Sequence, residues 1–156
     1  LNGIWRINML KNIGFYIDKV NTANRNIDIF KTLNSSIRRR KIKDASLFYN
    51  DIDYNPLIPA FGMFNAADMW NFTGTLFTTS LNNAFSANKI VNKFKLFHIY
   101  NRWDDKDILK VLEVANTIDV ITEDEDDAKE FYRITGKKPV HQFEQIDAIE
   151  LLEVLT

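Results

Sequence analysis

The segment that decides the fold is Asn12-Ile-Gly-Phe-Tyr-Ile-Asp-Lys-Val20, which continues into Asn21-Thr-Ala-Asn-Arg25 and a helix-forming stretch. Its apolar residues alternate along the chain, which is typical of a β-strand, and the polar residues that follow stop the strand. A helix is expected from about Asn26, a good N-cap residue. Its apolar face is formed by Ile27, Phe30, Leu33 and Ile37. A strand, a polar turn and an amphipathic helix in this order form the first part of a βαβ unit.

The same alternation of strand and helix continues along the rest of the chain. Further strands are expected at 44–50, 73–79, 93–100, 118–121 and 139–143, with a short one at 62–65. Helices are expected at 66–70, 81–92, after Asp104 or Asp107, and at the two segments that follow Ile121 and Phe143. Connections of this length imply right-handed crossovers. We therefore predict an α/β, Rossmann-like three-layer sandwich, with a mostly parallel sheet of about six strands and helices on both faces.

Both ends of one helix carry specific signals. Thr122-Glu-Asp-Glu125 matches a capping box, in which the first side chain caps the helix. Gly136 is a suitable C-terminal residue because it accepts a left-handed conformation. We therefore predict a helix that opens at Thr122 and ends at Gly136.

Length and composition are those of one domain. The chain is 46% hydrophobic and 13% aromatic, enough to form a core, so residues 12–156 are expected to be a single domain. Residues 1–11 would be an N-terminal extension, of which 1–8 are expected to be non-native, because the first strand begins only after Met9. The chain has no cysteine and two histidines far apart in sequence, so we predict no metal site. Without a long apolar run or a signal-peptide pattern, we expect a cytoplasmic protein that does not enter a membrane.

Charge is distributed unevenly along the sequence. Residues 1–43 contain ten Lys and Arg against two acids, whereas residues 104–156 contain six against fifteen. The basic run Arg38-Arg39-Arg40-Lys41-Ile42-Lys43 closes a predicted helix, where cations suit the helix dipole, and it contains no aromatic stacking residues. A nucleic-acid partner is therefore disfavoured. The asymmetry leaves open a homo-oligomer in which the basic third of one copy meets the acidic third of another, which light scattering at low and high salt would reveal.

Ligands of open parallel sheets bind beyond the carboxyl ends of the strands, so polar residues at those ends are candidate ligand contacts. These positions are Asp18, Asn21, Thr22, Asn24, Arg25, Asn26, Asp51, Thr79, Ser80, Asn101, Arg102, Trp103 and Glu123. Their hydroxyls, amides and helix-start N–H groups suit a nucleotide, a sugar or a phosphate. Arg25 could grip a phosphate through its guanidinium. Trp103 could stack on a base or sugar, although a position beneath the next helix is favoured.

Other chemistry-bearing residues have simpler structural explanations. His98 lies in an apolar strand and is predicted to be a hydrogen-bonded core residue, and Trp70 and Phe72 are predicted to lie in the core. The acidic residues 123–127 suit a helix start better than a cation site. The glycine-rich motifs of dinucleotide and nucleotide binding are missing, so no cofactor is predicted. No catalytic group can be assigned by spacing alone.

One resemblance bears on function. Val120-Ile-Thr-Glu-Asp-Glu-Asp-Asp-Ala-Lys-Glu-Phe131, followed by Thr135-Gly-Lys-Lys-Pro-Val-His141, resembles the end of the N-terminal half of GT-B glycosyltransferases, with Thr122-Glu123 in the place of the family's Ser-Glu. The family's next strand ends in Pro-Asn-Gly, whereas this chain has His141-Gln-Phe-Glu. The chain as a whole is similar to short marine cyanophage proteins with a glycosyltransferase-like N-terminal portion. This similarity implies that the protein is located in the cytoplasm of the phage's host.

The resemblance implies a glycosyltransferase-like domain that binds a ligand of unknown specificity. The GT-B family places the nucleotide-sugar chiefly on its second half, which has no counterpart in these 156 residues. A chain that resembles the first half is therefore expected to have little or no transferase activity by itself. The alternative is a non-enzymatic phage interaction protein that acts through self-association or through a partner.

Overall fold

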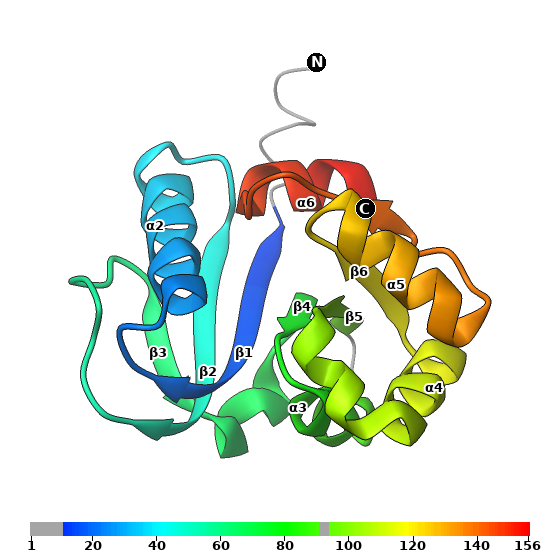
Figure 1. Cartoon of the computed structure of the whole chain (residues 1–156). Helices are drawn as coiled ribbons and strands as arrows, with labels where there is room; N and C mark the ends of the chain where they lie inside the picture. The colour runs from blue at the N-terminus through cyan, green and yellow to red at the C-terminus, as the bar shows by residue number, and fades with distance from the viewer. Residues whose placement is uncertain (1–10, 91–93) are drawn as a thin grey trace.

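A computed structural model describes residues 11–90 and 94–156. Its centre is a single sheet (Figure 1), which has seven strands. The strand order is β3-β2-β1-β4-β5-β6-β7, and every neighbouring pair is parallel. The strands are β1 (Asn12–Val20), β2 (Asp44–Ile52), β3 (Gly62–Asn65), β4 (Gly74–Thr78), β5 (Phe94–Tyr100), β6 (Asp119–Thr122) and β7 (His141–Gln142). The predicted Rossmann-like fold is confirmed, and the short strand expected at 62–65 forms β3, which pairs with β2 and brings the sheet to seven strands instead of about six.

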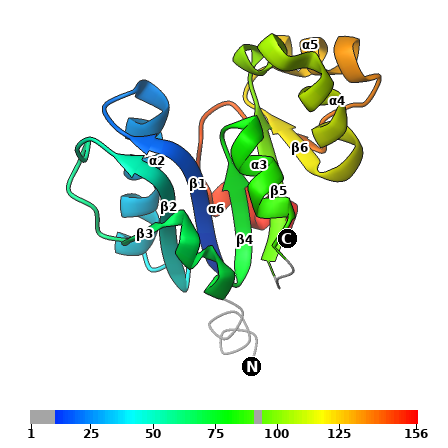
Figure 2. The same cartoon turned by 90° about the horizontal axis from the view of Figure 1, so that it is seen from below.

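Helices cover both faces of the sheet, which gives three layers. They are α2 (Asn24–Arg38), η1 (Ala66–Asn71), α3 (Leu81–Asn88), η2 (Arg102–Asp107), α4 (Ile108–Thr117), α5 (Glu125–Thr135) and α6 (Ala148–Leu155). Seen from below, α3 lies in front of the sheet and α6 behind it (Figure 2). The separate hydrophobic clusters agree, because α2 and α6 contribute to one, whereas α3, α4 and α5 contribute to another.

The larger core cluster includes residues of β1, β2, β4, β5 and β6. Phe15, Phe77 and Phe97 stand side by side on β1, β4 and β5, with ring centroids 5.2 and 5.6 Å apart. Leu33 of α2 and Leu151 of α6 close the cluster from the helix side and are fully buried. The alternating apolar residues of the strands therefore form a sheet face that packs against helices, as expected.

Two predicted helix starts are wrong, and each has a physical reason. Asn26 does not cap α2, which begins two residues earlier, after Ala23, because the Asn26 side chain instead holds the preceding loop. Thr122 does not cap α5, because β6 continues through it and pairs it with Tyr100. Asp124 provides the cap, its carboxylate accepting from the Asp127 N–H at 2.7 Å.

The other end of α5 follows the prediction. Gly136 is the C-terminal capping residue and has a φ of 71°, the left-handed region that favours glycine. Its N–H donates to the Tyr132 carbonyl at 2.8 Å, which satisfies one of the free carbonyls at the helix end. This cap involves only residues of α5 and Gly136, so the local sequence was sufficient to predict where the helix ends.

Some expectations fall outside the described residues. They are the N-terminal extension up to residue 10, residues 91–92 of the helix expected over 81–92, and the first residue of the strand expected at 93–100. The helix itself is shorter than expected, because α3 ends at Asn88 with Lys89 as its C-cap. Within the described residues, the basic run at 38–41 is exposed at the end of α2, as expected of a solvated helix end. Trp70 was predicted to lie in the core, but 61% of it is exposed, whereas Phe72 is buried as predicted. No helix in this part of the chain is long and apolar enough to cross a bilayer.

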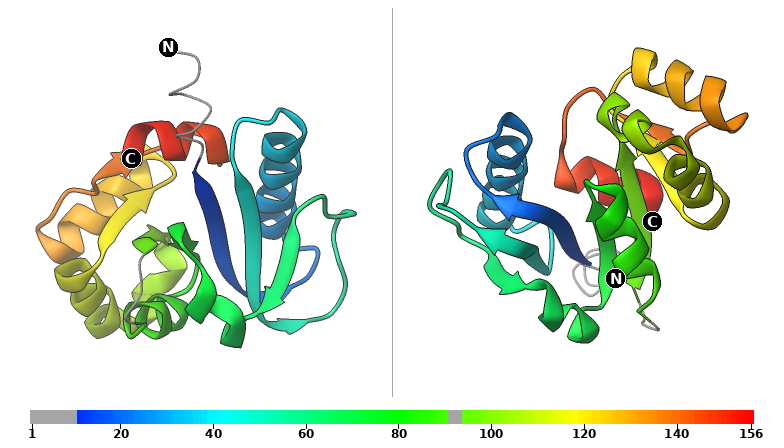
Figure 3. Two further views of the ribbon diagram at one scale, coloured as in Figure 1. Left: turned by 180° about the vertical axis from the view of Figure 1, so that it is seen from behind. Right: turned by 60° about the horizontal axis from the view of Figure 1, so that its bottom comes forward.

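The order of the strands determines where a ligand can bind. After β1 the chain moves outward to β2 and β3, and after β4 it moves outward in the opposite direction to β5, β6 and β7. The last helix then returns across the sheet to pack against α2 (Figure 3). Because the connections after β1 and β4 diverge, the carboxyl edge is open between them, at the usual ligand position of this fold class.

Candidate functional site

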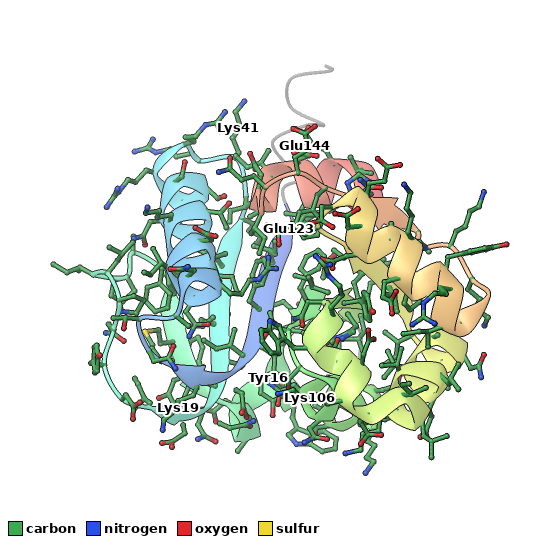
Figure 4. The ribbon with its side chains drawn as sticks, in the orientation of Figure 1. Tyr16, Lys19, Lys41, Lys106, Glu123 and Glu144 are labelled. Atoms are coloured by element: carbon green, nitrogen blue, oxygen red, sulfur yellow. The ribbon has the colours of Figure 1, made fainter. Side chains whose placement is uncertain are left out.

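A cleft of about 770 Å³ opens at the carboxyl edge of the sheet. Its walls come from the ends of β1, β4, β5 and β6 and from the starts of α2, η2 and α5. The cleft is lined by Ile17, Asp18, Lys19, Asn21, Ala23, Asn24, Arg25, Asn26, Asp28, Thr79, Ser80, Asn101, Arg102, Trp103, Glu123 and Asp127. Figure 4 shows Lys19, at the end of β1, on the edge of the molecule opposite Lys41, which precedes β2.

The structure brings together all the candidate residues from the sequence except two. Thr22 faces away from the cleft lining and places its hydroxyl 3.4 Å from that of Tyr54. Asp51 also lies outside the lining, 3.9 Å from the ammonium group of Lys19. Lys19, Asp28 and Asp127 also line the cleft, although they were not among the candidates from the sequence.

The start of α2 forms one wall of the cleft. Asn21 Oδ1 accepts hydrogen bonds from the Ala23 N–H at 2.9 Å and from Asn26 Nδ2 at 2.7 Å. Asn26 Nδ2 also donates to the carbonyl of Lys19 at 2.8 Å. These amides therefore hold the loop together and do not cap the helix. Among the described residues no side chain caps α2, and its first turn has no acidic residue, so the backbone N–H groups at its start can meet a ligand.

Two ion pairs join opposite walls of the cleft. Arg25 of α2 lies 2.6 Å from Glu123 after β6, and Arg102 of η2 lies 3.0 Å from Asp127 of α5. Burial raises the pKa of Asp127, as does the nearby charge of Asp124, while Arg102 opposes both effects. These pairs fix the positions of both guanidinium groups. Part of the acidic run at 123–127 thus builds the cleft, a role that the sequence did not indicate.

Trp103 projects into solvent instead of packing beneath α4, and 75% of it is exposed. The prediction of a buried position is wrong because Asp104 takes the inward position, where its carboxylate lies 2.8 Å from Nε2 of His98. Asn101 Oδ1 accepts from the Trp103 N–H at 2.9 Å, and Asp104 Oδ2 accepts from the Asn101 N–H at 3.5 Å as part of a capping box at the start of η2. The ammonium of Lys106 lies 5.0 Å from the centre of the indole ring. A large aromatic surface is therefore available at the mouth of the cleft.

Beneath this wall, His98 forms part of a buried polar chain. The Thr78 hydroxyl lies 3.0 Å from Nδ1 of His98, whose Nε2 contacts Asp104. Thr78 and His98 are at most 1% exposed, so the hydroxyl cannot reach a ligand in the cleft. The prediction of a hydrogen-bonded core histidine is confirmed. Its role is to tie β4, β5 and η2 together and so position the loop that carries Trp103.

A second polar network positions Asp18 on the opposite side of the cleft. Asn50 donates one hydrogen bond from Nδ2 to Asp18 Oδ1 and another to Asn83 Oδ1, both at 2.9 Å. The Tyr16 hydroxyl donates to Asn50 Oδ1 at 2.5 Å, and burial raises the pKa of this hydroxyl. Because these partners fix one carboxylate oxygen of Asp18, the other has a defined position beside the cleft. Sequence spacing could not have linked these residues, which come from β1, β2 and α3.

The cleft combines three kinds of binding group. The free N–H groups of α2 and the guanidinium groups can donate hydrogen bonds, the carboxylates of Asp18 and Asp28 can accept them, and Trp103 offers an aromatic face. Among the described residues, no group of three or more side chains has the composition and spacing to hold a metal ion. Donors, acceptors and an aromatic face together can hold a small polar molecule that has one flat or apolar part.

Comparison with known proteins adds no further constraint on this cleft. The fold is determined by the strand order and the binding groups by the side chains at the strand ends. Since one fold hosts many functions, the chemistry of the cleft has to carry the functional inference. No protein-family model, no curated protein and no solved structure matches the chain.

Proposed function

We propose that the cleft binds a small phosphorylated ligand that also carries hydroxyl groups, such as a sugar phosphate or a nucleotide. The observation that carries this proposal is the uncapped start of α2, whose Asn24, Arg25 and Asn26 line the cleft. The chain would then be a glycosyltransferase-like ligand-binding domain.

The phosphate preference follows from the end of the helix. The first N–H groups of a helix have no partner within the helix, and the helix dipole places a partial positive charge there. Most helices satisfy these groups with an Asp, Asn, Ser or Thr side chain, but α2 has Ala23 at that position. A phosphate would supply the missing acceptors, and Arg25 lies in the same turn to share its charge.

The remainder of the ligand would meet the opposite walls. Trp103 offers a surface on which a base or the C–H face of a sugar ring can stack. Asp18, with one carboxylate oxygen held by Asn50, can accept hydrogen bonds from sugar hydroxyls. These groups bind and orient a ligand. Glycosyl transfer would require a second domain or a partner, so the isolated chain is expected to bind without turnover.

A substitution at Ala23 tests the proposal. Ala23→Asp places a carboxylate where the phosphate would sit and gives α2 the N-cap that it lacks, so the variant should be more stable by about 0.5–2 kcal/mol. The same change should abolish ligand binding. Thermal-shift titration of the native chain with inorganic phosphate, glucose 1-phosphate, uridine monophosphate and glucose measures both effects, because a ligand of the folded state raises its melting temperature.

A control variant separates the effect of a carboxylate at position 23 from the effect of one added negative charge on the protein. Asn116→Asp introduces the same charge on the exposed C-terminal part of α4, outside the cleft lining, and should leave binding unchanged. A stabilised Ala23→Asp chain that still binds as well as the native chain would refute the phosphate position. A native chain that responds to none of the four ligands would refute the proposed function.

A further inference from the structure

A second cavity, of about 440 Å³, lies at the other end of the sheet. It is formed by the amino-terminal parts of β1 and β2, by β3, and by η1 and the residues after it. The described lining residues are Asn12, Asp44, Ser46, Phe48, Phe64, Asp68, Asn71, Phe72 and Thr73. This cavity shares no lining residue with the carboxyl-edge cleft, so it can have a function of its own.

Three aromatic rings form the apolar part of the cavity. The ring of Phe48 lies 5.9 Å from that of Phe64 and 5.4 Å from that of Phe72, measured between centroids. Phe64 is 40% exposed and packs tightly over Gly62, where a Cβ atom would lie 2.6 Å from the ring. A larger residue at position 62 would therefore displace this wall. Phe64 is the most open of the three rings, because Phe48 and Phe72, which pack edge to face, are only 3% and 8% exposed.

The polar part of the cavity contains acceptors and negative charge. Asp44 and Asp68 are exposed, and neither forms an ion pair with any described residue. Asn12 donates from Nδ2 to the Thr73 carbonyl at 3.1 Å, but its Oδ1 is buried and accepts no hydrogen bond among the described residues. No Lys, Arg or His is among the described lining residues. The described lining therefore carries no positively charged side chain, and its hydroxyl and amide groups, on Ser46, Asn71 and Thr73, can accept as well as donate hydrogen bonds.

We infer that this cavity is a binding site for a protonated alkylamine. A cation is attracted to the faces of aromatic rings, and the two carboxylates add to that attraction. The N–H groups of an ammonium ion would donate to the exposed carboxylates of Asp44 and Asp68. The alkyl part of the ligand would rest against Phe48, Phe64 and Phe72. Charge, apolar surface and hydrogen bonding thus select the same ligand class.

Titration of the ¹⁵N-labelled full-length chain with butylammonium tests this site. The amide signals of residues around Phe48, Asp68 and Phe72 should shift, while those of the carboxyl-edge cleft should not. Butanol and butyrate have the same alkyl chain without the positive charge, so they should bind at least about tenfold more weakly. Equal shifts from butanol would show an apolar hole without charge selection, and no shifts from butylammonium would show no site; either result overturns the inference.

Two variants distinguish the contributions of charge and ring. Asp68→Asn removes a charge from an exposed side chain, and Phe64→Leu keeps an apolar wall without a π face; each should weaken butylammonium binding by about three- to tenfold. Unchanged affinity in both variants would overturn the site even if the native chain binds. Ala23→Asp, at the opposite edge, should bind butylammonium normally, so failure of the phosphate proposal would leave this result unaffected.

Discussion

At the scale of single residues, a carboxylate beside a buried phenol has an environment that disfavours its charge. The Tyr100 hydroxyl donates to Asp105 Oδ1 at 2.7 Å, and Tyr100 itself is 1% exposed. Burial raises the pKa of Asp105, and the charge of Glu130 raises it further, while the hydrogen bond from Tyr100 opposes them. Because the pKa of Asp105 is higher in the folded than in the unfolded chain, its ionised form lowers the stability of the fold.

Asp105→Asn should therefore increase the free energy of unfolding at pH 7. The amide keeps an acceptor for Tyr100 but carries no charge, so the desolvation of a carboxylate is avoided. The gain should shrink as the pH falls through the raised pKa of Asp105 and vanish below its unfolded pKa of about 4, where the native carboxyl is protonated in both states. Urea unfolding at pH 7 and pH 3.5 checks this. Asp119→Asn, at an exposed position, is the control, and an Asp105→Asn chain less stable than the native one at pH 7 would contradict the prediction.

At the scale of elements, the start of α5 has two candidate capping residues, Thr122 and Asp124, and only Asp124 caps the helix. Thr122 is fully buried at the end of β6, and its hydroxyl has no hydrogen-bond partner among the described residues. Asp124 accepts from the Asp127 N–H and is the N-cap residue. The strand pairing of Thr122 with Tyr100 therefore overrides a sequence pattern that is otherwise typical of a helix start.

The two positions should respond in opposite ways to removal of their polar atoms. Thr122→Val keeps the shape and removes an unpaired hydroxyl, so the free energy of unfolding should stay level or rise by up to about 1 kcal/mol. Asp124→Ala removes the cap and should lower it by about 1 kcal/mol. Urea denaturation gives both values, and hydrogen exchange at the Asp127 amide reports the loss of the cap directly. A larger loss for Thr122→Val than for Asp124→Ala would restore Thr122 as the cap.

At the scale of the whole molecule, the first strand and the last helix pack into the same hydrophobic core. Leu151 of α6 is fully buried in the cluster that contains Phe15 of β1 and Phe30 of α2. The Ala148 N–H also donates to the Thr32 hydroxyl at 2.8 Å, a buried bond between α6 and α2. Residues at opposite ends of the sequence are thus parts of one core.

Leu151→Ala should lower the free energy of unfolding by about 2–5 kcal/mol, because it leaves a cavity between α6 and the sheet. Denaturation by urea, followed by both tryptophan fluorescence and circular dichroism, should show a single shifted transition. Glu153→Ala on the exposed side of the same helix should have little effect. If Leu151→Ala unfolds α6 alone and leaves the midpoint of the remaining structure in place, the helix is not part of the common core.

The two cavities at the scale of the molecule differ in what sequence reasoning could reach. The polar residues at the carboxyl ends of the strands were predictable, since parallel strands bring those ends to one edge. The amino-edge cavity was not, because it depends on how η1 crosses the sheet and on how Phe64 packs over Gly62. The self-association expected from the uneven charge stays a prediction.

Three features could be predicted from sequence patterns alone: the Rossmann-like architecture, the position of most strands, and the edge at which a polar cleft forms. These features follow from apolar periodicity and turn chemistry, which act between residues close in the chain. Only the tertiary structure decided that Trp103 faces solvent, that Asn26 holds a loop, and that Arg25 meets a carboxylate 98 residues away. Each of these outcomes depends on which side chain takes an inward position when distant elements pack, and no local pattern encodes that competition.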